Sequence, residues 1–291
     1  MEISSLREFR LRLLRGIAIH EEAYVKGMKE VANDRDRAGD EPLQWKEQTA
    51  YRSWQGALSW SVQRSRPDAN CEVNMAASKN IDANLQELRE LNKILKYLKS
   101  TISTKIFYPM MPGGSDEEKK FRLLGLSDAA LMNAEDGKSQ GGCLIWLCED
   151  MDSQNRSIVA HLIHWDSKKI DRVTRSSLAS ETYKVQDMTS VMEFINTMLK
   201  EMYGQEFPAD ARTDSESLIP HLSTSKRPRD LRLYGAIAQL RQDLEEKRLR
   251  NMKHVPDVDN ITDCLTKKNV PKKKKEKLRA ALCNGMTSRV H

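Results

Sequence analysis

Arg122-Leu-Leu-Gly-Leu-Ser-Asp-Ala129 has the alternating pattern of a β-strand. In an extended strand Leu124, Leu126 and Asp128 share one face, so an acid continues a row that begins as core. Burying a carboxylate costs free energy unless another group compensates its charge. We therefore expect a strand whose last inward position holds an acid with a special environment.

The residues that follow alternate between strand-like and helical patterns. Two more short runs, 143–148 and 158–165, are joined by Gly- and Asp-rich turns and suggest an antiparallel meander with the first strand. Beyond them we expect a helix over 177–203, a strand ending at Asp214, a helix over 231–246, a strand over 249–255 and a final helix after Asp259. This order predicts a mixed α/β layer architecture.

The first hundred residues have a different pattern. Up to about residue 103 the apolar residues recur at helical spacing, most clearly in the stripe Ile81, Leu85, Leu88, Leu91, Leu95 and Leu98. The loop Pro109-Met-Met-Pro-Gly-Gly-Ser115 then breaks regular structure. We predict a helical segment over 1–103, a linker over 104–120, an α/β domain over 121–270 and a solvated basic tail over 271–291, which begins with the run Lys272 to Lys277.

Composition narrows the class of protein. The net charge of +6 and the pI of about 9.0 favour a polyanionic partner. Five cysteines without a Cys-x-x-Cys pair indicate reduced thiols and an intracellular protein, in cytoplasm or nucleus. His161 and His164 share one predicted strand on opposite faces, so we expect no ligand pair from them. No segment approaches the roughly 18 apolar residues of a membrane span, so no membrane partner is expected.

Three further acids lie at positions where they could contribute to a site with Asp128. Glu181 lies in register with Leu178 and Val185 on the inward stripe of its helix, Asp214 closes a strand, and Asp263 lies in the last helical segment. Each acid alone also fits an ordinary role, such as a helix cap or a surface position. Together they can converge with Asp128 at one edge of a sheet. Clustered carboxylates repel each other, and a hard cation such as Mg²⁺ compensates that repulsion.

These residues resemble the ribonuclease H domain of the copia-type retrotransposon polyprotein. Five motifs occur in the family's order: Gly125-Leu-Ser-Asp-Ala129, Trp165-Asp-Ser-Lys-Lys169, Ser176-Ser-Leu-Ala-Ser-Glu181, Thr213-Asp-Ser-Glu-Ser217 and Thr262-Asp-Cys-Leu-Thr-Lys267. The resemblance implies a ribonuclease H-like mixed five-stranded sheet flanked by helices and preceded by a mainly helical segment. One departure is Ala130-Leu131, where the family usually has an acid and Trp.

The upstream residues are similar to the segment that connects polymerase and ribonuclease H in these elements. The similarity lies in Tyr51-Arg-Ser-Trp-Gln-Gly-Ala-Leu-Ser-Trp60, Arg66-Pro-Asp68 and Leu91-Asn-Lys-Ile-Leu-Lys-Tyr-Leu-Lys99. No Tyr-x-Asp-Asp polymerase motif occurs, so we expect no DNA synthesis from this polypeptide. It is interpreted as a part or relic of a retrotransposon reverse transcriptase, with the remainder of the polyprotein as a possible partner.

The resemblance also implies a chemistry. The chain is expected to be an endonuclease that cleaves the RNA strand of RNA–DNA hybrids, with two Mg²⁺ ions, or Mn²⁺ as a substitute. The implied catalytic and metal-binding residues are Asp128, Glu181, Asp214 and Asp263. Candidate phosphate contacts are Lys168, Lys169, Arg172 and Arg175, for which a solvated basic turn is an equal alternative. His254 is a candidate accessory residue for product release.

Two other functions stay open from the sequence. A catalytically inactive module derived from this enzyme would bind nucleic acid or a protein partner without cutting. An integrase-like nuclease would share the fold class but typically uses a smaller acidic set with its glutamate late in the domain. Because Glu181 comes second among the four acids, the integrase-like hypothesis ranks below the other two.

Overall fold

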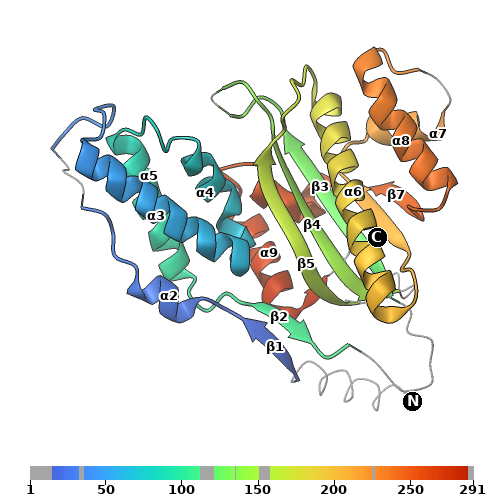
Figure 1. The fold of residues 1–291 in the computed structure, drawn as a ribbon, viewed down its shortest axis with the longest axis horizontal. Helices are drawn as coiled ribbons and strands as arrows, with labels where there is room; N and C mark the ends of the chain where they lie inside the picture. The colour runs from blue at the N-terminus through green and yellow to red at the C-terminus, as the bar shows by residue number, and fades with distance from the viewer. Residues whose placement is uncertain are drawn as a thin grey trace.

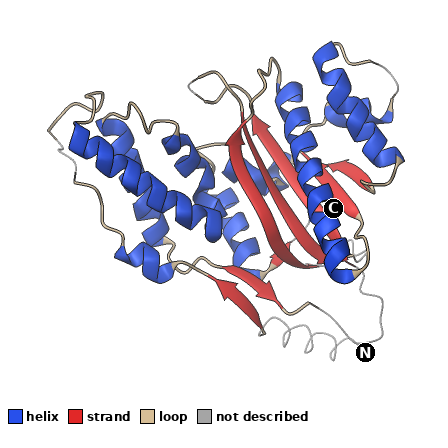
Figure 2. Ribbon diagram, in the orientation of Figure 1, coloured by secondary structure: helices blue, strands red, loops and turns tan. Residues whose placement is uncertain are grey.

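The computed structural model describes residues 15–32, 36–111, 121–134, 136–150, 158–224 and 227–287. Figure 1 shows a lobe of helices beside a twisted sheet, and Figure 2 shows that helices lie on both sides of that sheet. The helices are α2 (Glu22–Gly27), α3 (Trp45–Arg64), α4 (Asn70–Ala77), α5 (Leu85–Ser100), α6 (Ser177–Tyr203), α7 (Leu218–Ser223), α8 (Tyr234–Glu245) and α9 (Lys272–Asn284). The strands are β1 (Gly16–Ile19), β2 (Ile106–Pro109), β3 (Phe121–Ala130), β4 (Gln140–Glu149), β5 (Ile158–Lys169), β6 (Ala209–Thr213), β7 (Asn251–His254) and β8 (Met286–Thr287).

The main sheet has the order β7-β6-β3-β4-β5 with the short β8 at its edge. Strands β3, β4 and β5 form the expected antiparallel meander, while β6 and β7 run parallel to β3. This mixed five-stranded sheet flanked by helices, preceded by a mainly helical segment, confirms the predicted ribonuclease H-like fold class. Because parallel strands end at the same edge of a sheet, the ends of β3 and β6 bring Asp128 and Asp214 together.

Each face of the sheet has its own apolar core. One core joins Leu123 and Ile145 to Met188 and other residues of α6, α7 and α8. The other core joins the row Leu124 and Leu126 to α9. Asp128 continues this second row, as the alternation predicted.

Two glycines let backbone and side chains approach the sheet closely. A Cβ at Gly125 would lie 2.5 Å from the Met192 sulfur, and a Cβ at Gly142 would lie 2.4 Å from the Leu265 Cβ. Any side chain at Gly142 would therefore push away the short 3₁₀ helix 261–265 that carries Asp263.

Helix α6 has its predicted bounds, with a cap at each end. The Ser176 side chain accepts a hydrogen bond from the Ala179 N–H at the start, and Gly204 ends the helix in the left-handed conformation. Other predicted elements shift by a few residues, and the expected final helix divides into the 3₁₀ turn 261–265 and α9. The sequence patterns did not predict the short strands β1, β2 and β8.

Helix α5 carries the predicted apolar stripe with one correction. Asn84 and Glu87 form a capping box, so the helix begins at Leu85. Ile81 precedes this cap and is 85% exposed, whereas Leu85, Leu88, Leu91, Leu95 and Leu98 are buried. In the described part of the first segment, β1 is also a strand that pairs with β2, where helix and linker were expected.

The predicted basic tail is wrong for Lys272 to Lys277, which form the first turns of α9. Leu278 and Leu282 of this helix are fully buried against the sheet, so the basic run belongs to an amphipathic helix. Residues 112–120 of the predicted linker lie outside the described residues, and the proposed domain boundaries stay predictions. Among the described helices, none is long and apolar enough to cross a bilayer.

Candidate active site

Three of the four predicted acids meet at one edge of the sheet. Asp128 ends the inward row of β3, Asp214 directly follows β6, and Asp263 lies in the 3₁₀ turn 261–265. Each offers a carboxylate oxygen, and these oxygens all lie within 4.8 Å of one another. Three acids from three separate elements thus form one cluster, here called the acidic cluster.

Glu181 lies beside this cluster and is not one of its three members. It is half-buried in the second turn of α6, forms a hydrogen bond with Ser215 and interacts with the charge of Asp214. Burial, together with the nearby Asp214 charge, raises the pKa of Glu181. The structure therefore places Glu181 within reach of the Asp214 charge but outside the group of three carboxylates.

Burial and repulsion shift the proton affinity within the acidic cluster. Burial first, and the Asp214 charge second, raise the pKa of Asp128 to about 8. Burial and the Asp263 charge also raise the pKa of Asp214. For Asp263, burial is outweighed by hydrogen bonds from Lys267 and Lys274, which lower its pKa. These shifts favour a protonated Asp128 beside an ionised Asp263.

Lysines compensate part of this negative charge. Lys267 and Lys274 each donate a hydrogen bond to a different oxygen of Asp263, and the Thr266 hydroxyl donates to Asp128. The Lys267 ammonium also lies 3.9 Å from Asp128. The sequence patterns did not assign Thr266 or Lys274 to the site. Thr266 could have been found from its position in the Thr-Lys end of the last motif. Lys274 could not, because it lay in the segment predicted to be a tail.

The ligand set fits a hard divalent cation. All the available donors are carboxylate oxygens, which Mg²⁺ and Mn²⁺ prefer. The Oδ1 atom of Asp214 is buried and accepts no well-formed hydrogen bond from the described residues, although the Asn260 side chain interacts with this carboxyl and opposes the rise of its pKa. Asp128, Asp214 and Asp263, with Glu181 alongside, are the residues that would hold such an ion.

The predicted basic residues lie at the same end of the sheet. Asp128 pairs with Gly142, and Gly142 pairs with Ser167, which directly precedes Lys168 and Lys169. The backbone of these lysines therefore lies two strands from Asp128, about 10 Å across the sheet. Lys168 is exposed near Asp166, and Lys169 bonds Asp136 at 3.0 Å. Arg172 and Arg175 are both exposed, and Arg172 stacks over the Tyr183 ring at 4.8 Å.

His254 ends β7 at this edge. Its register partner is Thr213, the residue before Asp214, and its Nε2 atom lies 3.9 Å from the exposed Glu216 carboxylate. The side chain is one-third exposed and therefore accessible to a substrate near the acidic cluster.

No family model matches the sequence, and no curated protein matches it. Among solved structures, the chain is similar to LC11-RNase H1 in complex with an RNA/DNA hybrid (TM-score 0.36, 15% identity, covering 50% of this chain and 94% of that one). It is also similar to the N-terminal RNase H domain of Rv2228c from Mycobacterium tuberculosis, with a TM-score of 0.34 and 17% identity. That match covers 50% of this chain and 91% of the other. A third similar structure is the foamy viral protease-reverse transcriptase in complex with an RNA/DNA hybrid, with a TM-score of 0.33 and 12% identity. That match covers 61% of this chain and 26% of the other.

Proposed function

We propose that this chain is a divalent-metal-dependent endonuclease that cleaves the RNA strand of RNA–DNA hybrids, as a part or relic of a copia-type retrotransposon reverse transcriptase. The acidic cluster carries the proposal, because Asp128, Asp214 and Asp263 come from three elements of a ribonuclease H-like sheet and offer carboxylate oxygens within 4.8 Å of one another. Such a cluster is unfavourable without a cation.

Each group of site residues has its own proposed role. The acidic cluster and Glu181 hold two Mg²⁺ ions at the scissile phosphate, where bound metal supplies compensation of the charge that develops in an in-line displacement. Lys168, Lys169, Arg172 and Arg175 contact phosphates of the hybrid and position it without reading its sequence. Discrimination of a hybrid from pure DNA rests on backbone shape and the ribose 2′-hydroxyls. His254 assists release of the cleaved strand.

The test is cleavage of an RNA-labelled hybrid by the purified chain with Mg²⁺ or Mn²⁺, beside single-stranded and double-stranded RNA. We expect cleavage of the hybrid alone, and a loss of at least about 100-fold in Glu181→Gln, since a lost metal ligand removes its compensating charge. Glu201→Gln is the matched control, because Glu201 is an exposed acid on the same helix.

The second candidate is an inactive module that binds hybrids. Lys267 and Lys274 favour it, because they already compensate Asp263 without a metal. A folded wild-type chain that binds the hybrid but leaves it intact with either metal would contradict the endonuclease and support this module.

A further inference from the structure

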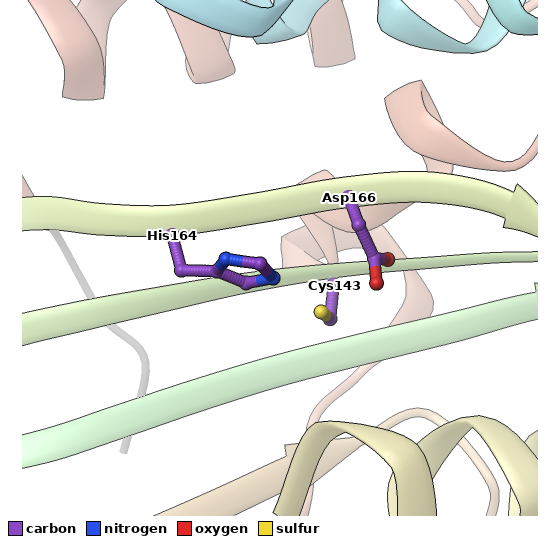
Figure 3. A group of neighbouring side chains, drawn as sticks. All are labelled: Cys143, His164 and Asp166. Atoms are coloured by element: carbon purple, nitrogen blue, oxygen red, sulfur yellow. The ribbon is translucent and has the colours of Figure 1, made fainter. Parts of the chain in front are cut away.

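A second group of possible ligands lies on the opposite face of the sheet. Figure 3 shows Cys143 of β4 and His164 and Asp166 of β5 turned toward a common space on one side of the two strands. One ligand atom from each residue lies within 4.8 Å of the others. Cys143 belongs to the core that contains α6, whereas Asp128 continues the row on the other face, so this group is separate from the acidic cluster.

The strand register brings these three residues together. Cys143 pairs with Asp166, and Ile145 pairs with His164, so both β5 residues face the side on which Cys143 lies. A bulge at Ile163 shifts the register beyond this point, and His161 pairs with Leu147. His161 and His164 therefore share a face, which corrects the expectation of opposite faces.

His164 has a free ligand atom. Its Nε2 is buried and has no hydrogen-bond partner in the described part of the chain. A buried imidazole nitrogen without a partner is costly, and coordination of a cation is one way to satisfy it. Burial lowers the pKa of His164, so the ring is neutral at physiological pH and has a lone pair to donate.

Both Asp166 oxygens face a lysine, one buried and one exposed, and the buried Lys184 also interacts with the Cys143 thiol. The exposed ion pair is the weaker of the two and can give way to a metal. The Asp166 Oδ1 atom accepts a hydrogen bond from Lys184 of α6, whose side chain is 1% exposed, while its Oδ2 has the exposed Lys168 at 3.7 Å. A carboxylate that bridges a buried ammonium and a metal is an ordinary outer-shell arrangement, because the second bond orients the ligand. The Asp166 side chain is 19% exposed, which provides a route for an ion from solvent.

We propose that Cys143, His164 and Asp166 form a binding site for a zinc-class divalent ion. A thiolate, an imidazole and a carboxylate are typical zinc ligands, with metal–ligand distances of about 2.0–2.3 Å. Three protein ligands leave a fourth position for water. On binding, the Cys143 thiol releases its proton to solvent and its sulfur bonds the ion. The site would link β4 to β5 and, through Lys184, to α6.

Cobalt(II) is a suitable probe, because only a site with a cysteine ligand gives the thiolate-to-cobalt charge-transfer band in the near ultraviolet. The full chain, stripped of metal with EDTA and desalted, is titrated with Co²⁺. We expect this band at one equivalent and its loss in Cys143→Ser. We also expect at least about 10-fold weaker binding in His164→Gln, because loss of an outer-shell partner alone already costs about that much affinity.

Two buried cysteines serve as matched controls. Cys148 lies on the same strand but in the other core, and Cys264 neighbours the acidic cluster; both are fully buried. Cys148→Ser and Cys264→Ser should retain the band. No band in the folded wild-type chain, or a band that survives Cys143→Ser, would overturn the site. If Cys143→Ser does not fold, His164→Gln decides: unchanged Co²⁺ affinity overturns the proposal. None of these results depends on hybrid cleavage.

Discussion

Asp128 is a buried acid that lowers the stability of the metal-free protein and is required by the proposed function. It is 3% exposed, and in the described structure its carboxylate receives the Thr266 hydroxyl hydrogen bond and faces two other acids. Such an environment favours the protonated form, and a metal would favour the ionised form. The ionised form of Asp128 is therefore unfavourable in the metal-free protein, and a bound divalent cation would stabilise it.

We predict that Asp128→Asn stabilises the metal-free protein while it abolishes cleavage. The pKa of Asp128 is raised to about 8, so its contribution to stability is fully present below the unfolded pKa and is lost as pH rises toward 8. At pH 8 in EDTA, the neutral amide should raise the free energy of unfolding by a few kcal/mol. The rise of the Asp128 pKa from 3.8 to about 8 sets an upper bound of about 6 kcal/mol, since one pKa unit corresponds to about 1.4 kcal/mol. Urea unfolding from pH 4 to 8 measures this.

The exposed Asp171 provides the control for this prediction, because Asp171→Asn changes the same charge without changing a buried group. The gain from Asp128→Asn should grow with pH and become small near pH 4, where Asp128 is protonated in the folded state and about half protonated in the unfolded state. A gain that does not depend on pH would contradict the raised pKa of Asp128.

At the scale of elements, α9 connects the core to the acidic cluster. Leu278 and Leu282 are buried on the face of the sheet that carries Asp128, and Lys274, one turn earlier, bonds Asp263. The same helix therefore supplies apolar contacts and a compensating charge. Its basic first turns are amphipathic and are not a free extension.

Leu282→Ala should lower the free energy of unfolding by about 2–5 kcal/mol, the cost of a cavity at a fully buried leucine. The measurement is urea unfolding of the full chain. Leu231→Ala is the control, since Leu231 is 69% exposed and its truncation should cost much less. Equal stability of the two variants would indicate that α9 does not contribute to the core in solution.

At the scale of the whole molecule, a buried polar network joins the helical lobe to the sheet domain. Arg66 forms two hydrogen bonds with Asp68, at 2.8 and 2.9 Å, and Tyr97 donates to the same carboxylate at 2.7 Å. Arg279 of α9 bonds the Tyr97 hydroxyl at 3.1 Å. Trp165 of β5 donates to the Val62 carbonyl at 3.0 Å. These contacts place the lobe against β5 and α9, as Figure 1 shows.

Asp68→Ala should destabilise the protein by about 3–5 kcal/mol, because it leaves the Arg66 charge buried without its partner. Thermal or urea unfolding measures the loss. Asp82→Ala, at an exposed position of the same lobe, should have little effect. A small effect of Asp68→Ala would mean that Arg66 reaches solvent, and that this network does not hold the lobe in place.

The sequence by itself determined the alternating strands, the long helix α6 and the positions of Asp128 and Asp214 at the ends of strands. Hydrophobic periodicity and caps such as Ser176 are local signals, so they predict elements without the tertiary structure. The motif order also predicted the sheet class, and with it the convergence of Asp128 and Asp214 at the ends of parallel strands.

Only the tertiary structure decided which charges share a space. Lys274 lies near Asp263, and Lys184 near Asp166, across sequence separations that no local pattern encodes. The bulge at Ile163 reversed the relative faces of His161 and His164, because one extra residue changes the alternation. The basic run of α9 resembled a solvated tail, since its apolar residues acquire a partner only when the sheet has formed.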